Sequence, residues 1–251
     1  MSDTDTTVTP ASATSARPRL ALVIGAGGGL GAALVQAIGA PGSHGIDRVL
    51  ALGRATQPAI DYSDEASLRN AAAWVAAQCA AEGAELRLLI VASGFLHGQE
   101  GQPERSWSHL DPDYLRQVFL VNTIGPALVM KHFLPLLPRQ GRCVAGFVSA
   151  KVGSIGDNAL GGWYGYRAAK AALNQLVKTA AIELKRRNPE ALCVALHPGT
   201  VDTALSKPFA KAGLKLRPPE VAATELLSVL AGLEPAQTGT LVDYQGKVLP
   251  W

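Results

Sequence analysis

The sequence lacks the long apolar runs and charge blocks that would indicate a membrane span or a nucleic-acid surface. Glycine, proline or a charged residue interrupts every apolar stretch before it approaches the roughly 18 residues that a span needs. The net charge is +3, and no long block of like charges occurs. We assign the densest basic cluster, Lys185-Arg186-Arg187, to a helix C-terminus, where it complements the helix dipole. No nucleic-acid or membrane partner is expected.

Paired cysteines, clustered metal ligands and a secretory signal are also missing from the sequence. The three cysteines stand far apart in apolar sequence, which is typical of buried thiols and not of a disulfide framework: Cys79, Cys143 and Cys193. The five histidines show no metal-ligand spacing. The N-terminal residues contain no basic region followed by an apolar one. We therefore expect a cytoplasmic protein without a metal site.

The composition that is present indicates one globular domain. Hydrophobic residues make up 48% of the chain and charged residues 17%, which excludes a disordered protein. Residues 1–19 are rich in Ser, Thr, Pro and Ala and are predicted to form a disordered leader. The domain is then expected to span residues 20–251.

Strand and helix patterns alternate along this domain. Apolar runs closed by turn residues predict strands at 20–24, 48–52, 59–61, 86–92, 142–149, 191–197 and 239–244. Helical patterns fall between them, at 30–38, 63–81, 111–136, 164–186 and 219–231. Pro126 is expected to kink the third of these helices. The alternation predicts an α/β fold, a doubly wound parallel sheet with helices on both faces.

A glycine-rich turn follows the first predicted strand. It fits the spacing G-x-x-x-G-x-G at Gly25, Gly29 and Gly31. Glycines there allow a tight turn and a close backbone approach to phosphate, and the helix that follows presents free N–H groups to an anion. The alternative is a flexible turn without a ligand. After a buried strand, the loop favours a dinucleotide site that also includes Gly28 and Leu30.

The end of the second predicted strand bears on which dinucleotide binds. Sites for NAD usually carry an acidic residue about 20 residues after the glycines, which accepts a hydrogen bond from the ribose 2′-OH. Here the strand ends in Leu52-Gly53-Arg54, with no acid. Arg54 would pair with the 2′-phosphate of NADP(H); its alternative is a solvated surface arginine. We therefore expect NADP(H) in preference to NAD(H).

Tyr166 and Lys170 begin a predicted helix and share one face of it, because they are four residues apart. A tyrosine hydroxyl with a pKa near 10 is a poor proton relay at neutral pH. An adjacent ammonium group lowers that pKa and makes the tyrosine a usable general acid or base. Tyr164 lacks such a partner, since the residue four positions on is Ala168.

Taken together, these motifs resemble the short-chain dehydrogenase/reductase family from Leu20 to Trp251. The resemblance rests on the glycine loop, Asp61, Val91-Ala92-Ser93-Gly94, Asn122, Tyr166 with Lys170, and Pro198-Gly199 through Thr203. Further segments, at 153–158, 161–164 and the ending at Trp251, are similar to sniffer-type carbonyl reductases and C-factor-like proteins. The resemblance implies a single-domain Rossmann-like fold.

The resemblance also implies roles for individual residues. Asp61 would contact the adenine, Lys170 would also bind the nicotinamide ribose, and Thr203 would hold the carboxamide. Asn122 would break its helix locally and hold a water that relays protons to Lys170. Other residues implied at the cofactor are Tyr62, Ala92, Ser93, Gly94, Pro198, Gly199 and Val201.

The sequence departs from the family pattern where a catalytic serine is expected. The family usually ends this strand in a serine pair, of which the second polarises the substrate carbonyl, whereas the pair here is Ser149-Ala150. The hydroxyl would then come from Ser149 or from Ser154. We favour Ser149, because a strand end holds a side chain more rigidly than a glycine-bounded loop does.

The expected function is the NADP(H)-dependent reduction of an aldehyde, ketone or quinone to an alcohol, with Tyr166 as proton donor. The alternative is a dinucleotide-binding signalling or regulatory protein with little or no turnover. The polar segment 204–219 is expected to form a lid over the substrate, and Trp163 and Phe95 to be apolar walls or plain core. The resemblance permits a monomer, a homodimer or a homotetramer.

Overall fold

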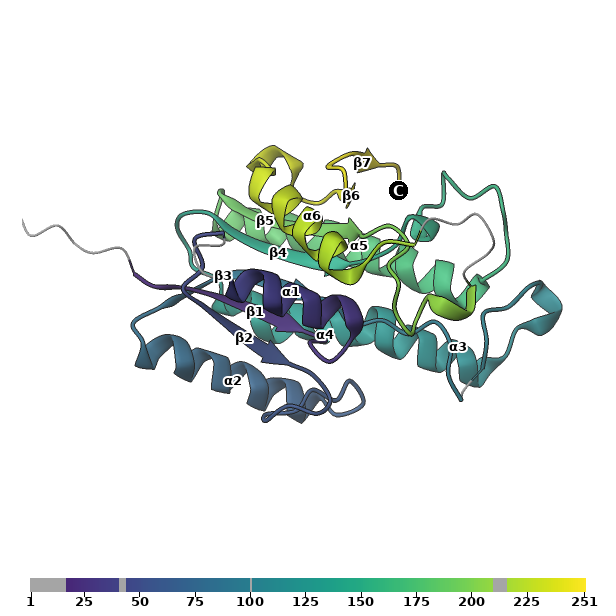
Figure 1. The fold of residues 1–251 in the computed structure, drawn as a ribbon, viewed down its shortest axis with the longest axis horizontal. Helices are drawn as coiled ribbons and strands as arrows, with labels where there is room; N and C mark the ends of the chain where they lie inside the picture. Colours follow the sequence, from purple (N-terminus) through teal and green to yellow (C-terminus); the bar gives the residue numbers. More distant parts are fainter. Residues whose placement is uncertain (1–16, 41–43, 100, 210–215) are drawn as a thin grey trace, which may run out of the picture.

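The apolar segments of the sequence become the strands of one sheet (Figure 1). The strands are β1 (Arg19–Ile24), β2 (Arg48–Leu52), β3 (Glu85–Val91), β4 (Cys143–Val148), β5 (Ala191–His197), β6 (Leu241–Asp243) and β7 (Val248–Leu249). They lie in the order β2-β1-β3-β4-β5-β6-β7, and every neighbouring pair is parallel except β6 with β7. The sheet brings the carboxyl ends of the parallel strands to one edge.

The computed structural model describes residues 17–40, 44–99, 101–209 and 216–251. Most of the predicted leader, residues 1–16, therefore lies outside the described residues. β1 begins at Arg19, one residue before the predicted start of the domain.

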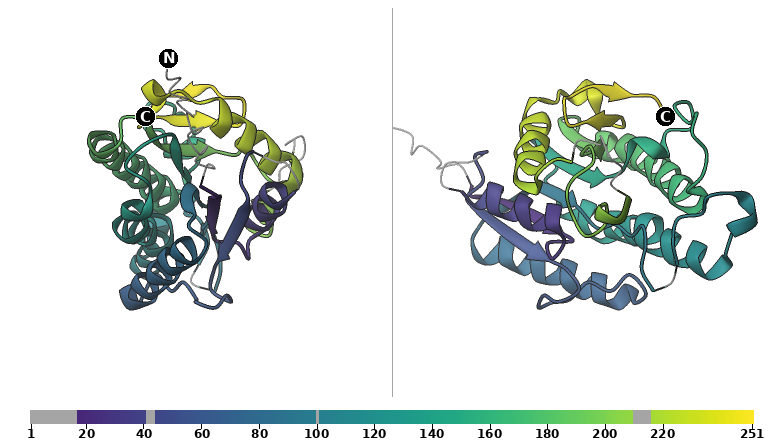
Figure 2. Two further views of the ribbon diagram at one scale, coloured as in Figure 1. Left: turned by 90° about the vertical axis from the view of Figure 1, so that its left-hand side faces the viewer. Right: turned by 45° about the vertical axis from the view of Figure 1, so that its right-hand side comes forward.

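Two layers of helices enclose the sheet, as the end-on view in Figure 2 shows. One face is covered by α1 (Gly29–Gly39) and α6 (Pro219–Gly232), and the other by α2 (Glu65–Ala81), α4 (Gly125–Phe133) and α5 (Tyr164–Arg187). Alternate strand residues enter the two cores: Leu22 packs on the α2 side and Val23 on the α1 side. This confirms the predicted fold, a doubly wound Rossmann-like α/β domain.

The predicted break at Pro126 occurs one turn earlier. In place of one kinked helix, the chain forms α3 (Pro112–Phe119), a π-helical turn η2 (Leu120–Ile124), α4 and the short turn Leu134–Leu136. Pro126 is the second residue of α4 and has no N–H to donate to a preceding carbonyl, so the widened turn comes just before it. The N–H of Gly125 accordingly donates five residues back, to the carbonyl of Leu120.

The predicted strand at 59–61 is wrong. The chain there forms a loop, because Ile60 donates its N–H back to the carbonyl of Gly53 at 2.9 Å. Asp61 likewise donates its N–H to the hydroxyl of Ser67. These local bonds use the groups that a strand would offer to a neighbour. The antiparallel strand β7, in contrast, was not predicted, since its two residues are too short to show a pattern.

The helical stretch Pro112–Leu136 needs separate mention because it is long and apolar. An 18-residue window of it reaches a mean hydropathy of 1.3, enough by length and composition for a membrane span. Half of that window is buried within the molecule, where Val129 and Phe133 pack into the core. A soluble protein's core helix has these same properties.

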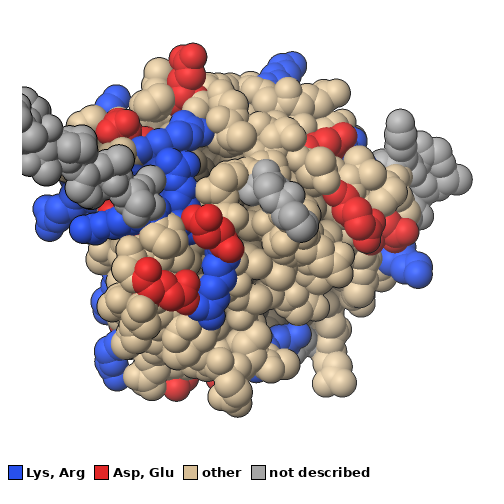
Figure 3. All heavy atoms as spheres, turned by 60° about the vertical axis from the view of Figure 1, so that its left-hand side comes forward, with Lys and Arg blue, Asp and Glu red and all other residues tan. Residues whose placement is uncertain are grey.

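Charges on the molecule mix in sign. Figure 3 shows basic side chains beside acidic ones on the face that holds the amino ends of the strands. Arg48 pairs with Glu82 there, and Arg87 with Glu85. Lys185, Arg186 and Arg187 lie in the last turn of α5, which confirms their predicted place. The three cysteines are free thiols, of which Cys143 and Cys193 are buried.

Candidate active site

The glycine turn after β1 has backbone conformations and clearances that require glycine. Gly25 adopts a φ of +90°, and a Cβ there would lie 2.7 Å from the backbone nitrogen of Ser93. A Cβ on Gly31 would lie 2.1 Å from the carbonyl oxygen of Gly25. The first residue therefore permits close approach to the end of β3, and the second allows α1 to pack against the turn.

The start of α1 is open to an anion. Gly28 precedes the helix without any capping side chain, and the first turn contains no acidic residue. Among the described residues, none accepts a hydrogen bond from the N–H of Gly29, Leu30 or Gly31. These groups and the helix dipole fit a dinucleotide pyrophosphate. Thr203 lies over the same turn, since its Cγ2 would be 2.8 Å from a Cβ on Gly29.

The loop after β2 contributes two candidate cofactor residues, both exposed, which differ in their hydrogen bonds. Arg54 is exposed and has no hydrogen bond or ion pair within the part of the chain that the structure describes. The carboxylate of Asp61 accepts hydrogen bonds from the N–H and hydroxyl of Ser63, which hold its pKa below the usual range. Arg54 is thus free to bind a phosphate, whereas Asp61 is already positioned by its own loop.

Tyr62 joins that loop to the end of β3. Its hydroxyl lies 2.6 Å from the hydroxyl of Ser93, and its ring packs against the start of α4 so closely that Gly125 has no room for a Cβ. Burial raises the pKa of Tyr62 to about 12. Tyr62 therefore stays a neutral structural link beneath the turn Ala92–Gly94, where the resemblance implies the cofactor.

Asn122 occupies the π-helical turn η2, as the resemblance implied for a local helix break. Its side-chain Nδ2 donates to the carbonyls of Phe95 and Val118 at 2.7 and 2.9 Å. Its Oδ1 accepts from the N–H of Phe95 at 3.1 Å. Asn122 is completely buried, so this amide ties the segment after β3 to the widened turn. Thr123 ties the same turn to α5 by donating to the carbonyl of Ala169 at 2.9 Å.

Tyr166 and Lys170 lie together on the buried face of α5. The Nζ of Lys170 is 5.7 Å from the centre of the Tyr166 ring and donates to the carbonyl of Val148 at 2.9 Å. Burial lowers the pKa of Lys170 to about 7 and raises that of Tyr166 well above its ordinary value. Burial thus favours the neutral, proton-carrying form of Tyr166.

The two candidate serines are both buried and both hydrogen-bonded. Ser149 donates to Oδ1 of Asn174 at 2.7 Å, and Ser154 accepts from the N–H of Asp157 at 3.2 Å. Ala150, in contrast, packs in the small hydrophobic cluster that includes Tyr166. A serine has one hydroxyl proton, so Ser149 can polarise a carbonyl only after it gives up the bond to Asn174.

That hydrophobic cluster forms an apolar wall around Tyr166. Phe95, Trp163 and Phe209 all pack in it. Phe209 belongs to the predicted lid 204–219, of which residues 210–215 lie outside the described residues. Pro198, Gly199 and Val201 follow β5 at the same edge of the sheet, and Val201 pairs with Arg217 on the far side of the lid.

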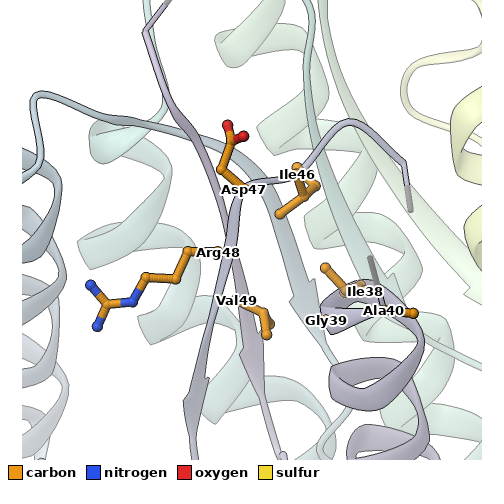
Figure 4. Close-up of a pocket in the computed structure, with 7 residues that line it drawn as sticks. All are labelled: Ile38, Gly39, Ala40, Ile46, Asp47, Arg48 and Val49. Atoms are coloured by element: carbon orange, nitrogen blue, oxygen red, sulfur yellow. The ribbon is translucent and has the colours of Figure 1, made fainter. Parts of the chain in front are cut away.

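The cavity in Figure 4 lies away from these groups. It measures about 250 Å³ and is lined by the end of α1 and the start of β2. Among its lining residues, Asp47 already accepts a hydrogen bond from the N–H of Arg19. The cavity therefore lies at the amino ends of the strands, opposite the glycine turn. The described residues contain no cluster of metal-ligating side chains.

Comparison with known proteins decides the family. A family model described as short chain dehydrogenase matches residues 19–213. The chain belongs to the short-chain dehydrogenase family. This membership makes the protein an oxidoreductase whose family binds a nicotinamide dinucleotide, in agreement with the open glycine turn.

Two relatives match large parts of this chain. C-signal of Myxococcus xanthus is 39% identical over 146 residues, which cover 56% of this chain and 82% of that protein. The 1-hydroxy-2-glutathionyl-2-methyl-3-butene dehydrogenase of Rhodococcus sp. is 30% identical over 201 residues, 80% of this chain and 82% of that protein.

Solved structures agree with the fold. The NADPH-bound carbonyl reductase from chicken fatty liver superposes with a TM-score of 0.79 at 26% identity, covering 94% of this chain and 95% of that one. The carbonyl reductase Sniffer of D. melanogaster gives the same TM-score at 22% identity, covering 94% of this chain and all of that one. The short-chain dehydrogenase fold is therefore shared along nearly the whole chain.

Sequence reasoning missed one buried charge near this site. Glu104 is 2% exposed and lies between β3 and α3, in a loop without periodicity. It accepts hydrogen bonds from the backbone of residues about sixty positions later, so no local pattern in the sequence marks it.

Proposed function

We propose that this protein reduces the carbonyl group of a small aldehyde, ketone or quinone, with NADPH as the hydride donor. The observation that carries the proposal is the pair Tyr166 and Lys170, buried together at the sheet edge where the glycine turn is open to an anion. Membership in an oxidoreductase family supports it.

The proposed mechanism assigns one task to each side chain. When bound, NADPH supplies the hydride. Tyr166 donates its phenolic proton to the oxygen that gains charge as the carbonyl is reduced. Lys170 lies next to that ring and returns a proton to it, and the amide of Asn122 holds η2 in the form that lines this relay. Ser149, the predicted polarising hydroxyl, reaches the carbonyl by turning away from Asn174.

Removal of the Tyr166 hydroxyl tests the proposal. Tyr166→Phe keeps the ring but removes the proton, and we expect turnover of an aldehyde, ketone and quinone panel to fall by about 100-fold or more. NADPH absorbance measures the rate. The matched control is Tyr164→Phe, two residues away and exposed, which is expected to keep the wild-type rate. Full activity in Tyr166→Phe would refute the proposed role.

The cofactor preference rests on Arg54. The guanidinium of Arg54 follows β2 and has no ion pair with any described residue, which favours the 2′-phosphate of NADP(H). The chicken fatty liver relative was solved with NADPH bound. We expect Arg54→Ala to raise the KM for NADPH by about 10-fold or more and to leave the KM for NADH unchanged. Equal losses with both cofactors would contradict a specific phosphate contact.

A second candidate function is signalling or regulation through dinucleotide binding. The 39% identity to C-signal favours it, as does alanine at position 150. In that case wild type and Tyr166→Phe would bind NADPH equally and neither would turn over any of the panel. Titration of NADPH by fluorescence, alongside the rate assay, separates the two functions.

The surroundings of the site complete the proposal. Residues 204–219 would cover the substrate, and a small-molecule substrate fits the apolar wall beside Tyr166. A cytoplasmic homodimer or homotetramer is proposed as the working form, and light scattering of the purified protein measures its size.

A further inference from the structure

A buried carboxylate lies beside Tyr166 and has no part in the proposed proton relay. Glu104 is 2% exposed, and both of its side-chain oxygens accept from the N–H of Gly165 at 3.1 Å. Burial of a carboxylate is costly unless hydrogen bonds or opposite charge compensate for it. Here the N-terminus of α5 supplies hydrogen bonds through its free N–H groups and partial positive charge through its dipole.

The fit between Glu104 and α5 depends on the absence of a side chain at Gly165. A Cβ there would lie 2.9 Å from Oε1 of Glu104 and 2.9 Å from Cδ2 of Leu115. Gly165 directly precedes Tyr166 in the chain. Burial, Glu104 and Tyr166 together raise the pKa of Tyr114, which indicates that these groups share one poorly solvated region.

The backbone of Glu104 holds a second residue. Its carbonyl accepts from the N–H of Trp163 at 2.6 Å. Trp163 has the left-handed conformation, with a φ of 53° and a ψ of 43°, directly after Gly161 and Gly162, which are left-handed as well. A bulky residue rarely adopts this conformation, and it persists only where neighbours impose it. Glu104 is such a neighbour, because it accepts hydrogen bonds from the N–H groups of Trp163 and Gly165.

This conformation sends the Trp163 ring toward the active site. The ring centres of Trp163 and Tyr166 are 6.2 Å apart at 79°, and those of Trp163 and Phe209 are 5.3 Å apart at 70°. His97 meets Phe209 at 5.4 Å. Trp163 is partly buried, and its ring contacts both Tyr166 and Phe209. The wall beside Tyr166 is therefore aromatic and offers flat apolar contact area.

We propose that Glu104 is a positioning residue that clamps Trp163 against Tyr166, and that the resulting wall selects aromatic or other flat apolar carbonyl compounds. The substrate class rests on the proposed reductase function, whereas the clamp itself does not. Glu104 touches no reacting atom. It acts through the backbone of Trp163 and Gly165.

A double-mutant cycle tests the substrate class. The variants are Glu104→Ala, Trp163→Ala and the double variant, with the exposed neighbour Arg105→Ala as control. For each, kcat/KM is measured with an aromatic aldehyde and with a small aliphatic aldehyde. The ratio of these two values does not depend on how much of the enzyme is folded.

We expect each single variant to lower the ratio by about 10-fold and the double variant to lower it no further, because both remove one wall. Arg105→Ala keeps the wild-type ratio. Glu104→Gln, which retains one acceptor oxygen, is expected to lose less than Glu104→Ala and replaces it if that variant does not fold. An unchanged ratio in the Glu104 variants, or additive losses, would overturn the proposal.

A second measurement tests the clamp without turnover. The near-ultraviolet CD difference between wild type and Trp163→Phe isolates the indole signal of Trp163. The same difference is taken in the Glu104→Ala background, which keeps the carbonyl that accepts from Trp163 and loses the side-chain bonds to Gly165. We expect the signal to fall clearly there, and to fall less in the Glu104→Gln background. A retained signal overturns the clamp. If wild type reduces no carbonyl compound, the proposed function fails, and this CD comparison still decides whether Glu104 positions Trp163.

Discussion

At the level of single residues, the end of β4 places two neighbouring side chains in different surroundings. Ser149 is buried against α5 and donates its proton to Asn174, whereas Ala150 packs in the cluster around Tyr166. The position that packs in the cluster with Tyr166 thus carries a methyl group, and the hydroxyl of Ser149 is bonded to Asn174. A hydrogen-bond donor to the carbonyl oxygen is usually worth about 100-fold in rate.

We therefore expect Ala150→Ser to raise kcat/KM by about 10-fold, since it restores a donor beside Tyr166. Ser149→Ala should lower the free energy of unfolding by about 1–3 kcal/mol, because it removes the hydrogen bond to Asn174. It should also lower kcat by about 100-fold, because it removes the proposed polarising hydroxyl. Steady-state rates and urea unfolding of both variants give the two quantities. An unchanged kcat in Ser149→Ala would show instead that Ser149 has a structural role and does not polarise the carbonyl.

At the level of elements, η2 shows which features of a helix can be predicted from its sequence and which cannot. Pro126 signals that the stretch 111–136 is not one regular helix, because it lacks an N–H. The site of the distortion depends on Asn122, whose amide bonds to Phe95 from another part of the chain. A contact between residues so far apart in the chain produces no periodic pattern in the sequence. The contact between Glu104 and Gly165 cannot be predicted from periodicity for the same reason.

Asn122→Ala removes three hydrogen bonds, of which two tie η2 to Phe95 in the segment after β3 and one joins the amide to the carbonyl of Val118 in α3. It leaves the N–H and carbonyl of Phe95 without that partner, so we expect the free energy of unfolding to fall by about 2–3 kcal/mol. Thr123→Val is the matched control, because it removes a single bond, to Ala169, and should cost about 1 kcal/mol. Equal effects of the two variants in urea unfolding would contradict the role of the Asn122 amide.

At the level of the whole molecule, the parts that could be predicted are those set by local pattern. Buried parallel strands such as β1 and β5 are continuous apolar runs, so they and the fold class followed from the sequence. The glycine turn and the Tyr166/Lys170 spacing are equally local. The bond from Ser149 to Asn174 joins residues on different elements, and periodicity does not report it. The segment 59–61 was missed because short-range loop bonds replace strand pairing, and β7 because two residues show no pattern.

Lys170 links this buried site to the stability of the whole chain. Burial lowers its pKa from 10.5 to about 7 in the folded protein, while the unfolded chain keeps the ordinary value. Between these two values the unfolded state binds more protons than the folded state, so the free energy of unfolding rises with pH. The slope contributed by one such group is at most about 1.4 kcal/mol per pH unit.

Replacement of Lys170 by methionine removes the contribution of this group to the pH dependence of the free energy of unfolding. We expect wild type to gain stability relative to Lys170→Met as the pH rises from about 7 to about 9, measured by urea unfolding at several pH values. Groups that titrate in both proteins, such as Cys193, cancel in this difference. Lys178→Met, an exposed lysine on the same helix, should track wild type at every pH. If the two proteins differed in free energy of unfolding by the same amount at every pH, Lys170 would stay charged in the folded protein. Its proposed exchange of protons with Tyr166 would then begin from the ammonium form.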